Sequence, residues 1–310
     1  MPILFHALGC SGFKLYIYGM KMTGCLLLFF CFFHTCYAAI DPIEGSVKAG
    51  GFSIKYSEAG SGESLIFVHA GMLDRHMWDN QLAFFSRRYR VITFDLPAHG
   101  ETMGTDTTIL VSEVINILMD SLKIQHASFV GLSLGSVCVS EFVLSHPERV
   151  KEIVLVSPGF IGSTKQLTVD SLSKQLYAKT DAALMAHDNT KYARLFTSIW
   201  CVGPFRDSSQ VPATLRQYIY QTVLANCKNH SQNDWRPFGK IPTARALGNI
   251  KSKTLLINGG KDVPFNLTMA NYLLAVIRST GYVIRNAAHM VNLDYADLFN
   301  KKVLDFLLLY

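Results

Sequence analysis

The sequence predicts an α/β fold in which a doubly wound, mostly parallel sheet carries an inserted helical cap. Short apolar runs alternate with helical patterns along most of the chain, and this order is typical of such sheets. One stretch of about 90 residues interrupts the alternation and is too long for an ordinary connection. The composition agrees with a folded protein, because 49% hydrophobic and 17% charged residues exclude a disordered chain.

Seven short runs of β-branched and apolar residues are predicted to be strands. Runs such as Leu65–Val68 and Ile153–Val156 are apolar without alternation, as expected for strands that are buried on both faces of a parallel sheet. The first run follows Gly50 and Gly51, which indicates one arm of an antiparallel hairpin. The predicted strands are Phe52–Tyr56, Leu65–His69, Arg90–Phe94, Ala127–Gly131, Glu152–Ser157, Thr254–Asn258 and Tyr282–Arg285.

Helical patterns lie between the later strands. The segment Ile109–Leu122 repeats its apolar residues with a period close to 3.6. A second helix is predicted over Leu134–His146 and ends just before Pro147, which cannot continue it. A third, over Asp297–Leu309, closes the chain.

The interruption extends from about Ile161 to Ile250 and contains no parallel-strand run. It has helix-like segments over Asp181–Thr197 and Ala213–Ala225. Its aromatic residues are expected mostly to form the core of a cap, with a minority lining a pocket. The predicted organisation is therefore a leader (1–38), a first part of the core (39–160), a cap (161–250) and a second part of the core (251–310).

Residues 1–38 resemble a secretory signal peptide. They contain no acidic residue, an apolar run over Cys25–Phe33, and small residues at Cys36 and Ala38 that predict cleavage after Ala38. The alternative is an uncleaved membrane anchor, because Met22–Ile40 has no formal charge and approaches the ~20 residues that span a bilayer. Both interpretations place the folded part outside the cytoplasm, as a secreted, periplasmic or membrane-anchored protein.

Few partners follow from charge and cysteine content. The net charge is +6, and the 29 Lys and Arg are scattered, so a nucleic-acid surface is not expected. Without the leader, Cys138, Cys201 and Cys227 remain, and three thiols form no disulfide framework. The sequence leaves open whether Cys201 and Cys227 pair in an oxidising compartment.

The sharpest local pattern is the pentapeptide Gly131-Leu132-Ser133-Leu134-Gly135. It directly follows a predicted strand and opens the helix predicted from Leu134. A serine on such a tight strand-to-helix turn exposes its hydroxyl at the end of the sheet, and the flanking glycines allow the close approach of strand and helix. Ser133 is therefore the candidate nucleophile.

A serine hydroxyl is a weak nucleophile that needs a base, and the base needs an orienting carboxylate. His289 follows the last predicted strand and is the candidate base, while Asp262 follows the strand before it and is the candidate carboxylate. Open α/β sheets place their sites at these carboxyl ends. The chain order Ser133, Asp262, His289 is the order expected for a hydrolase of this architecture.

With these segments the chain resembles the α/β-hydrolase superfamily, over nearly all of residues 47–310. Val68–Met72 resembles the family's His-Gly oxyanion loop, Asp95–Gly100 its Asp-x-x-Gly-x-Gly turn, and His289–Leu293 its usual continuation after the catalytic histidine. Two departures are Ala70, where the family commonly has glycine, and Pro97-Ala98, where Arg-Gly is common.

In such a fold the oxyanion hole uses the amide after the nucleophile and one from the loop after the third strand. The amide after the nucleophile belongs to Leu134. Gly71 is the first choice for the other donor, and Met72 is the second.

Other polar residues are expected to be structural. His69 is predicted to order the oxyanion loop and His99 to belong to a turn, and a zinc site at His69, His76 and His99 is disfavoured because ligands at the usual spacing are missing. Asp95 also ends a strand and competes for the role of the triad carboxylate, but it precedes Ser133 in the chain, so Asp262 is preferred.

The resemblance implies a serine hydrolase that cleaves a carboxylic ester or related acyl bond of a small apolar molecule through an acyl-enzyme, without metal or organic cofactor. A carbon–carbon bond or enol-lactone hydrolase with the same triad is the alternative. A ligand-binding protein of the same fold without turnover is the second alternative. Haloalkane and epoxide hydrolysis are disfavoured, because those branches have aspartate in place of Ser133. The expected partner is a small molecule, with a membrane only if the leader is uncleaved.

Overall fold

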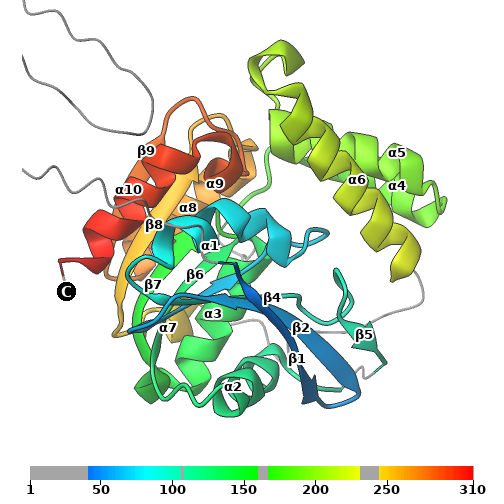
Figure 1. Cartoon of the computed structure of the whole chain (residues 1–310). Coiled ribbons are helices and arrows are strands. Elements are labelled where there is room, and N and C mark those ends of the chain that lie inside the picture. The colour runs from blue at the N-terminus through cyan, green and yellow to red at the C-terminus, as the bar shows by residue number, and fades with distance from the viewer. Residues whose placement is uncertain (1–40, 106–107, 160–166, 231–243, 310) are drawn as a thin grey trace, which may run out of the picture. The chain divides into compact units, whose positions relative to one another are not determined.

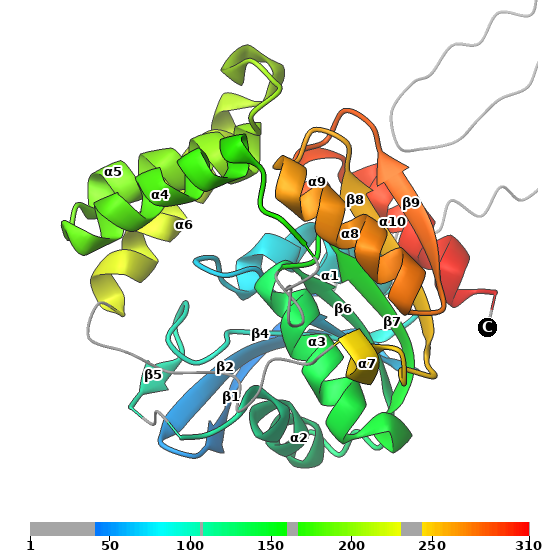
Figure 2. The same ribbon diagram turned by 180° about the vertical axis from the view of Figure 1, so that it is seen from behind.

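The computed structural model describes residues 41–105, 108–159, 167–230 and 244–309 (Figures 1 and 2). Within these ranges the strands form a nine-stranded sheet in the order β1-β2-β4-β3-β6-β7-β8-β9, with β5 paired to β2. From β4 to β9 neighbouring strands are parallel, whereas β1, β2 and β5 add antiparallel pairs. The strands are β1 (Ile43–Ala49), β2 (Phe52–Ala59), β3 (Ser64–Val68), β4 (Arg90–Phe94), β5 (Met103–Gly104), β6 (Ala127–Leu132), β7 (Val150–Val156), β8 (Lys253–Gly259) and β9 (Ser279–Ile284).

The helices fall into two groups, those that cover the sheet and those inserted between β7 and β8. The first group comprises η1 (Arg75–Trp78), α1 (Asp79–Phe85), α2 (Val111–Ser121), α3 (Leu134–Ser145), η2 (Pro147–Arg149), α8 (Pro264–Val276), α9 (Val291–Asp294) and α10 (Ala296–Leu307). The second group comprises α4 (Ser171–Met185), α5 (Asn189–Phe196), η3 (Thr197–Val202), η4 (Ser208–Gln210), α6 (Ala213–Asn229) and α7 (Ala244–Leu247). Of the second group, α4, α5 and α6 lie together beyond one end of the strands (Figures 1 and 2), and we refer to them with η3 as the cap.

Helices pack on both faces of the sheet, which confirms the predicted doubly wound architecture. Ile66 and Val68 of β3 belong to the hydrophobic cluster that includes α2, α3 and α8, whereas Leu65 and Phe67 belong to the cluster that includes α1 and α10. All four side chains are fully buried. Because successive side chains of a strand point to opposite faces, a strand covered on both sides must be apolar throughout, as the sequence of β3 is.

The seven predicted strands are all present, and the expected hairpin is the antiparallel pair of β1 and β2. Gly50 has a φ of 56° in its turn, a conformation that glycine adopts at little cost. Strand β5 was not predicted, because two residues carry no periodic pattern. The predicted helices beginning near Ile109, Leu134 and Asp297 correspond to α2, α3 and α10.

The prediction of one helix over Asp181–Thr197 was wrong. The structure has two helices here, α4 and α5, which are separated at His187, where φ is 51°. The carboxylate of Asp188 accepts the amide of Lys191 at 2.9 Å and thereby starts α5 as an N-cap. A capping aspartate can end one helix and begin another while the spacing of the apolar residues on both sides continues almost unchanged.

Two further findings concern the thiols and membrane spans. Cys138, Cys201 and Cys227 are buried free thiols, so Cys201 and Cys227 form no disulfide in this structure. Within the described ranges, no helix combines the length and the apolar character that crossing a bilayer requires. The proposed leader lies outside the described residues.

Candidate active site

Ser133 occupies a strained turn between β6 and α3. Its φ is 54°, which is unusual for a residue other than glycine, and its amide donates to the carbonyl of Val156 at 2.9 Å. A Cβ atom on Gly131 would collide with the backbone of Gly135, and one on Gly135 would collide with the carbonyl of Val68. The two glycines therefore allow α3 to start directly against the ends of β6 and β3, and Ser133 lies half-buried at that junction.

Asp262 and His289 form a buried pair at the same end of the sheet. His289 Nδ1 lies 2.7 Å from Asp262 Oδ2, and both residues are at most 3% exposed. The loops that carry them are joined by backbone hydrogen bonds, among them one from the amide of Lys261 to the carbonyl of Ala287 at 2.8 Å. The other oxygen of Asp262 accepts the amide of Val263 at 2.6 Å. These hydrogen bonds fix the orientation of the carboxylate toward His289.

The end of β7 connects the segments that carry Ser133 and His289. Ser133 is bonded to Val156, the last residue of that strand, and the hydroxyl of the next residue, Ser157, donates to the carbonyl of His289 at 2.9 Å. The amide of Ser157 in turn donates to Ile257 of β8 at 2.8 Å. The three residues expected from the sequence therefore follow the carboxyl ends of β6, β8 and β9, and β7 lies between β6 and β8 in the sheet.

The candidate oxyanion loop, Ala70–Leu73, lies next to the start of α3. A Cβ atom on Gly71 would lie 3.6 Å from the Cβ of Leu134, so the backbones of these two residues approach closely. The amide of Leu73 donates to the carbonyl of Ala70 at 3.2 Å, and the amide of Ala70 faces the sulfur of Met77 at 3.2 Å. In the described part of the chain, the amides of Gly71, Met72 and Leu134 have no hydrogen-bond partner and are therefore available to a ligand.

The surroundings of His69 and His99 indicate structural roles for both residues. The Nδ1 of His69 lies 2.7 Å from the carbonyl of Ala70, and its Nε2 accepts the amide of Leu96 at 2.9 Å, so the ring joins the oxyanion loop to the loop after β4. Burial lowers the pKa of His69 to about 4 and that of His99 to about 3, which keeps both rings neutral at pH 7. Over the described ranges, no group of three or more His, Cys, Asp or Glu side chains is arranged to hold a metal ion.

Asp95 does not contact His289, because its carboxylate is hydrogen-bonded to Arg75. Its carboxylate accepts the Arg75 amide at 2.7 Å, the Arg75 guanidinium at 2.6 Å and the amide of Glu101 at 2.8 Å. Both Asp95 and Arg75 are buried, and Arg75 also contacts the exposed carboxylate of Glu101. The carboxylate that competed for the triad role on sequence grounds is therefore part of an ion-paired loop.

The cap contributes contacts to the acid–base pair that the sequence did not reveal. The ring of Trp200 on η3 lies 4.8 Å from the ring of His289 and stacks on Tyr177 of α4 at 5.9 Å. The hydroxyl of Tyr177 donates to the amide oxygen of Asn266 at 3.2 Å, and the amide nitrogen of Asn266 lies 3.3 Å from Asp262 Oδ1. Trp200 belongs to a π-helical turn, a feature that is frequent at functional sites. The aromatic content of the cap was the only sequence signal.

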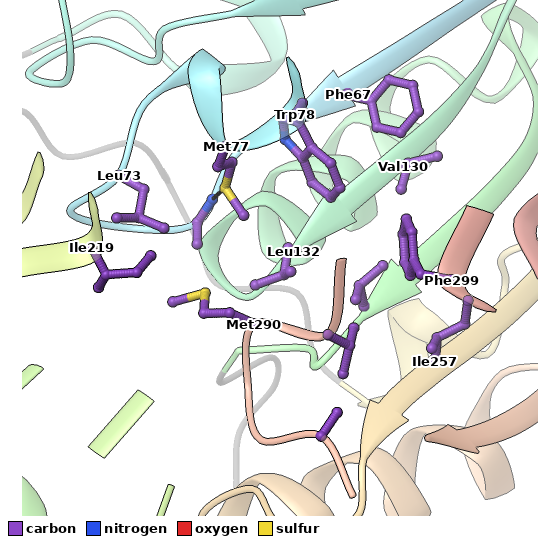
Figure 3. Packing of buried hydrophobic residues seen from close by; sticks show 14 of the residues in the cluster. Phe67, Leu73, Met77, Trp78, Val130, Leu132, Ile219, Ile257, Met290 and Phe299 are labelled. Carbon is purple, nitrogen blue, oxygen red and sulfur yellow. Dashed lines mark hydrogen bonds between the residues drawn. The ribbon is translucent and has the colours of Figure 1, made fainter. Parts of the chain in front are cut away.

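Buried apolar side chains lie beside the polar groups. Leu132 precedes Ser133, Met290 follows His289, and Leu73 ends the oxyanion loop. Figure 3 shows these three side chains close to Ile219 of the cap helix α6, and all four belong to one hydrophobic cluster and are at most 1% exposed. Core and cap thus build an apolar wall together, next to the segments that carry Ser133 and His289.

The chain is similar to known proteins over most of its length. The chain is 27% identical over 272 residues to the 2-hydroxy-6-oxo-6-phenylhexa-2,4-dienoate hydrolase of Comamonas testosteroni, covering 83% of this chain and 91% of that enzyme. It is 25% identical over 279 residues to carboxylesterase YbfK of Bacillus subtilis (strain 168), covering 86% and 89%. The crystal structure of that carboxylesterase, CesB (YbfK), superimposes with a TM-score of 0.71 at 22% identity, over 86% of this chain and 92% of that one.

The sequence model of one family, described as alpha/beta hydrolase fold, matches residues 63–296, which is most of the chain. The match includes the turn at Ser133 and the loops of Asp262 and His289. The relatives compared above are hydrolases by name. The chain is therefore a hydrolase and belongs to the alpha/beta hydrolase fold family.

Proposed function

We propose that the protein is a serine hydrolase that cleaves a carboxylic ester or related acyl bond through an acyl-enzyme, with Ser133, His289 and Asp262 as its catalytic triad. The observation that carries the proposal is the 2.7 Å contact between His289 Nδ1 and Asp262 Oδ2, at the sheet end that also holds Ser133 on its strained turn. A carboxylate at Nδ1 holds the imidazole in the tautomer whose Nε2 can accept a proton.

The chemistry then follows in two halves. Ser133 Oγ attacks the acyl carbon while its proton passes to His289 Nε2, and the amides of Leu134 and Gly71 stabilise the oxyanion that forms. The bond to the leaving group breaks as His289 returns the proton to it, which leaves an acyl ester on Ser133. Water, deprotonated by His289, attacks that ester and releases the acid and the free serine.

The apolar wall favours a substrate with an apolar group next to the acyl bond. Leu73, Leu132, Met290 and Ile219 are buried against one another beside the proposed triad. Each methylene that such a wall removes from water contributes about 0.8 kcal/mol of binding. A series of p-nitrophenyl esters from acetate upward is therefore expected to show kcat/KM rising with chain length before it falls.

A carbon–carbon bond hydrolase is the second candidate, favoured by the similarity to the Comamonas testosteroni enzyme. The substrate in that enzyme's name is a dienoate, whose carboxylate needs a cation or several donors. The buried cations Arg75 and Arg206 are each paired with an aspartate. We therefore rank ester cleavage first. Faster turnover of a vinylogous diketone acid than of any p-nitrophenyl ester would reverse this order.

The proposed function is tested by labelling with a fluorophosphonate. The purified protein is expected to form a covalent adduct on Ser133, located by peptide mass spectrometry, and Ser133→Ala is expected to abolish both the adduct and ester hydrolysis. Ser136→Ala serves as the matched control, because its hydroxyl is bonded to the carbonyl of Gly131 at 2.6 Å. A wild-type protein without adduct or hydrolysis would instead support a ligand-binding protein of the same fold.

We also propose that residues 1–38 direct export and are removed after Ala38. The support is the sequence pattern alone, a charged start followed by an apolar centre and small residues. The mass of the N-terminal peptide of the protein made in its own cells tests this. An N-terminus at Ala39 is expected, whereas an intact leader in the membrane fraction would indicate an anchor.

A further inference from the structure

Asn226 is a buried amide of the cap that joins two loops of the core. It lies on α6 and is 5% exposed. Its nitrogen donates to the carbonyl of Met72 at 3.1 Å and to the carbonyl of Thr222 at 3.2 Å, while its oxygen accepts the amide of Gly100 at 2.8 Å. Donor and acceptor sides are therefore both used, and the side chain bridges the oxyanion loop and the loop after β4.

The oxyanion loop has few internal bonds to hold its shape. Met72 has a φ of 62°, a strained conformation that surrounding contacts must maintain. Within the loop, the amide of Leu73 bonds to Ala70, and the carbonyl of Met72 is held by Asn226. The amides of Gly71 and Met72, which are the candidate oxyanion donors, are thus carried by a backbone that the cap fixes at its carboxyl end.

A second cap residue strengthens the bridge at its other end. The Nε2 of His230, the residue after α6, lies 3.0 Å from the carbonyl of Gly100, while the amide of Gly100 is bonded to Asn226. The amide and the carbonyl of Gly100 thus both bind side chains near the end of α6. This arrangement fixes the position of Asn226 relative to the core, so that the amide holds the oxyanion loop in place.

We propose that Asn226 is a positioning residue of the active site, which holds the oxyanion loop from the cap so that its amides face the developing oxyanion. The inference rests on the proposed serine hydrolase function and deepens it. It makes transition-state stabilisation depend on the cap being seated on the core. Asn226 touches no reacting atom in this account and acts through the backbone of Met72.

The test compares Asn226→Asp with Asn229→Asp, the same change on the same helix at an exposed position. The first variant keeps the size and one acceptor but places a carboxylate oxygen against the carbonyl of Met72. Hydrolysis of a p-nitrophenyl ester is measured per active site, counted by completed fluorophosphonate labelling, so that unfolded protein does not enter the rate. We expect kcat to fall about 10- to 100-fold in Asn226→Asp, less than for loss of a whole donor, with KM nearly unchanged.

The readout specific to the oxyanion is the ratio of rates for an ester and its thionoester. Sulfur accepts hydrogen bonds poorly, so the thionoester gains less from the donors, and a misplaced loop is expected to lower the ratio by about tenfold. A change that only loosens the fold lowers both rates equally and leaves the ratio unchanged. Should Asn226→Asp be insoluble, Asn226→Ala removes the same donor without adding charge and carries the same expectation.

The outcomes separate the two proposals. An active wild type whose Asn226 variants keep the wild-type ratio would overturn the positioning role and leave the serine hydrolase standing. A rate ratio that falls equally in Asn229→Asp would also overturn the positioning role. The effect would then come from the added negative charge on α6. A wild type that neither labels nor hydrolyses either compound would overturn the hydrolase itself, and the positioning role with it.

Discussion

Asp95 and Asp262 follow β4 and β8 at the same end of the sheet, and both are almost fully buried. Their carboxylates differ in the partners that they bind. Three donors saturate Asp95, two of them from Arg75, whose guanidinium cannot release its proton. Asp262 instead gives one oxygen to His289, a ring that can gain and lose a proton. The partner therefore decides whether a buried carboxylate holds a charged guanidinium or an imidazole ring that is able to transfer protons.

The largest expected effect is the loss of kcat on replacing Asp262. Asp262→Asn keeps the shape but removes the charge that orients His289, and we expect kcat for ester hydrolysis to fall about 10⁴-fold, as in other triads. The free energy of unfolding in urea is expected to change less than in Asp95→Asn, because that change also leaves a buried guanidinium without its buried carboxylate. A variant that keeps near wild-type kcat would show that another group orients His289.

Asp95→Asn is expected to give the reverse pattern. The change removes the buried counter-charge of Arg75 and leaves it only the exposed carboxylates of Glu44 and Glu101, at a cost of about 3–5 kcal/mol in the free energy of unfolding measured in urea. Rates per labelled active site are expected to stay within about tenfold of wild type, since no proton transfer involves this pair. Full stability together with lost turnover would contradict the assignment of Asp95 as structural.

Acid is expected to destabilise the protein through its buried neutral histidines. Burial lowers the pKa of His69 from its ordinary 6.5 to about 4, so the unfolded chain binds more protons than the folded one between these values. The stabilisation is complete above pH 6.5 and is lost as the pH falls toward 4. His69→Gln, which can keep both hydrogen bonds, is expected to reduce the slope of unfolding free energy against pH by about 1.4 kcal/mol per unit.

That slope is measured from urea unfolding at several values between pH 4 and pH 7. His146→Gln is the control, because His146 has an exposed contact to Ser145 and does not belong to the buried pair of His69 and His99. An unchanged slope in His69→Gln would mean that His69 already carries its proton in the folded protein.

The smallest effect is expected at Glu101, one of two exposed partners of Arg75. The Glu101 side chain is 64% exposed, although its oxygen lies 2.6 Å from Arg75. Exposed ion pairs contribute at most about 1 kcal/mol, so Glu101→Gln is expected to change the unfolding free energy by less than that. A loss as large as that in Asp95→Asn would show that the loop acts as a single network, and it would weaken the contrast with Asp262.

Much of the fold followed from local pattern. The strands β3, β4, β6, β7 and β8 were predictable because a strand buried on both faces must be apolar at successive positions, whatever its neighbours are. The helix from Leu134 followed from the glycines before it and Pro147 after it. The break at His187 was missed because a single capping aspartate competes with an apolar repeat that continues on both sides.

Residues that depend on distant partners and belong to none of the family's motifs could not be predicted. Asn226 and Met72 are 154 positions apart, and Trp200 and His289 are 89 apart, so no spacing rule relates them. Their side chains are also common in ordinary helices. The packing of the cap on the core gives them their contacts.

The sequence by itself determined the order of strands and helices and the placement of Ser133, Asp262 and His289 at strand ends, since backbone preferences and burial act over a few residues. Only the tertiary structure decided that Asp262 binds His289 while Asp95 binds Arg75, and that Asn226 reaches the oxyanion loop. Hydrogen bonds act over about 3 Å, so a partner is fixed only when the whole chain has folded.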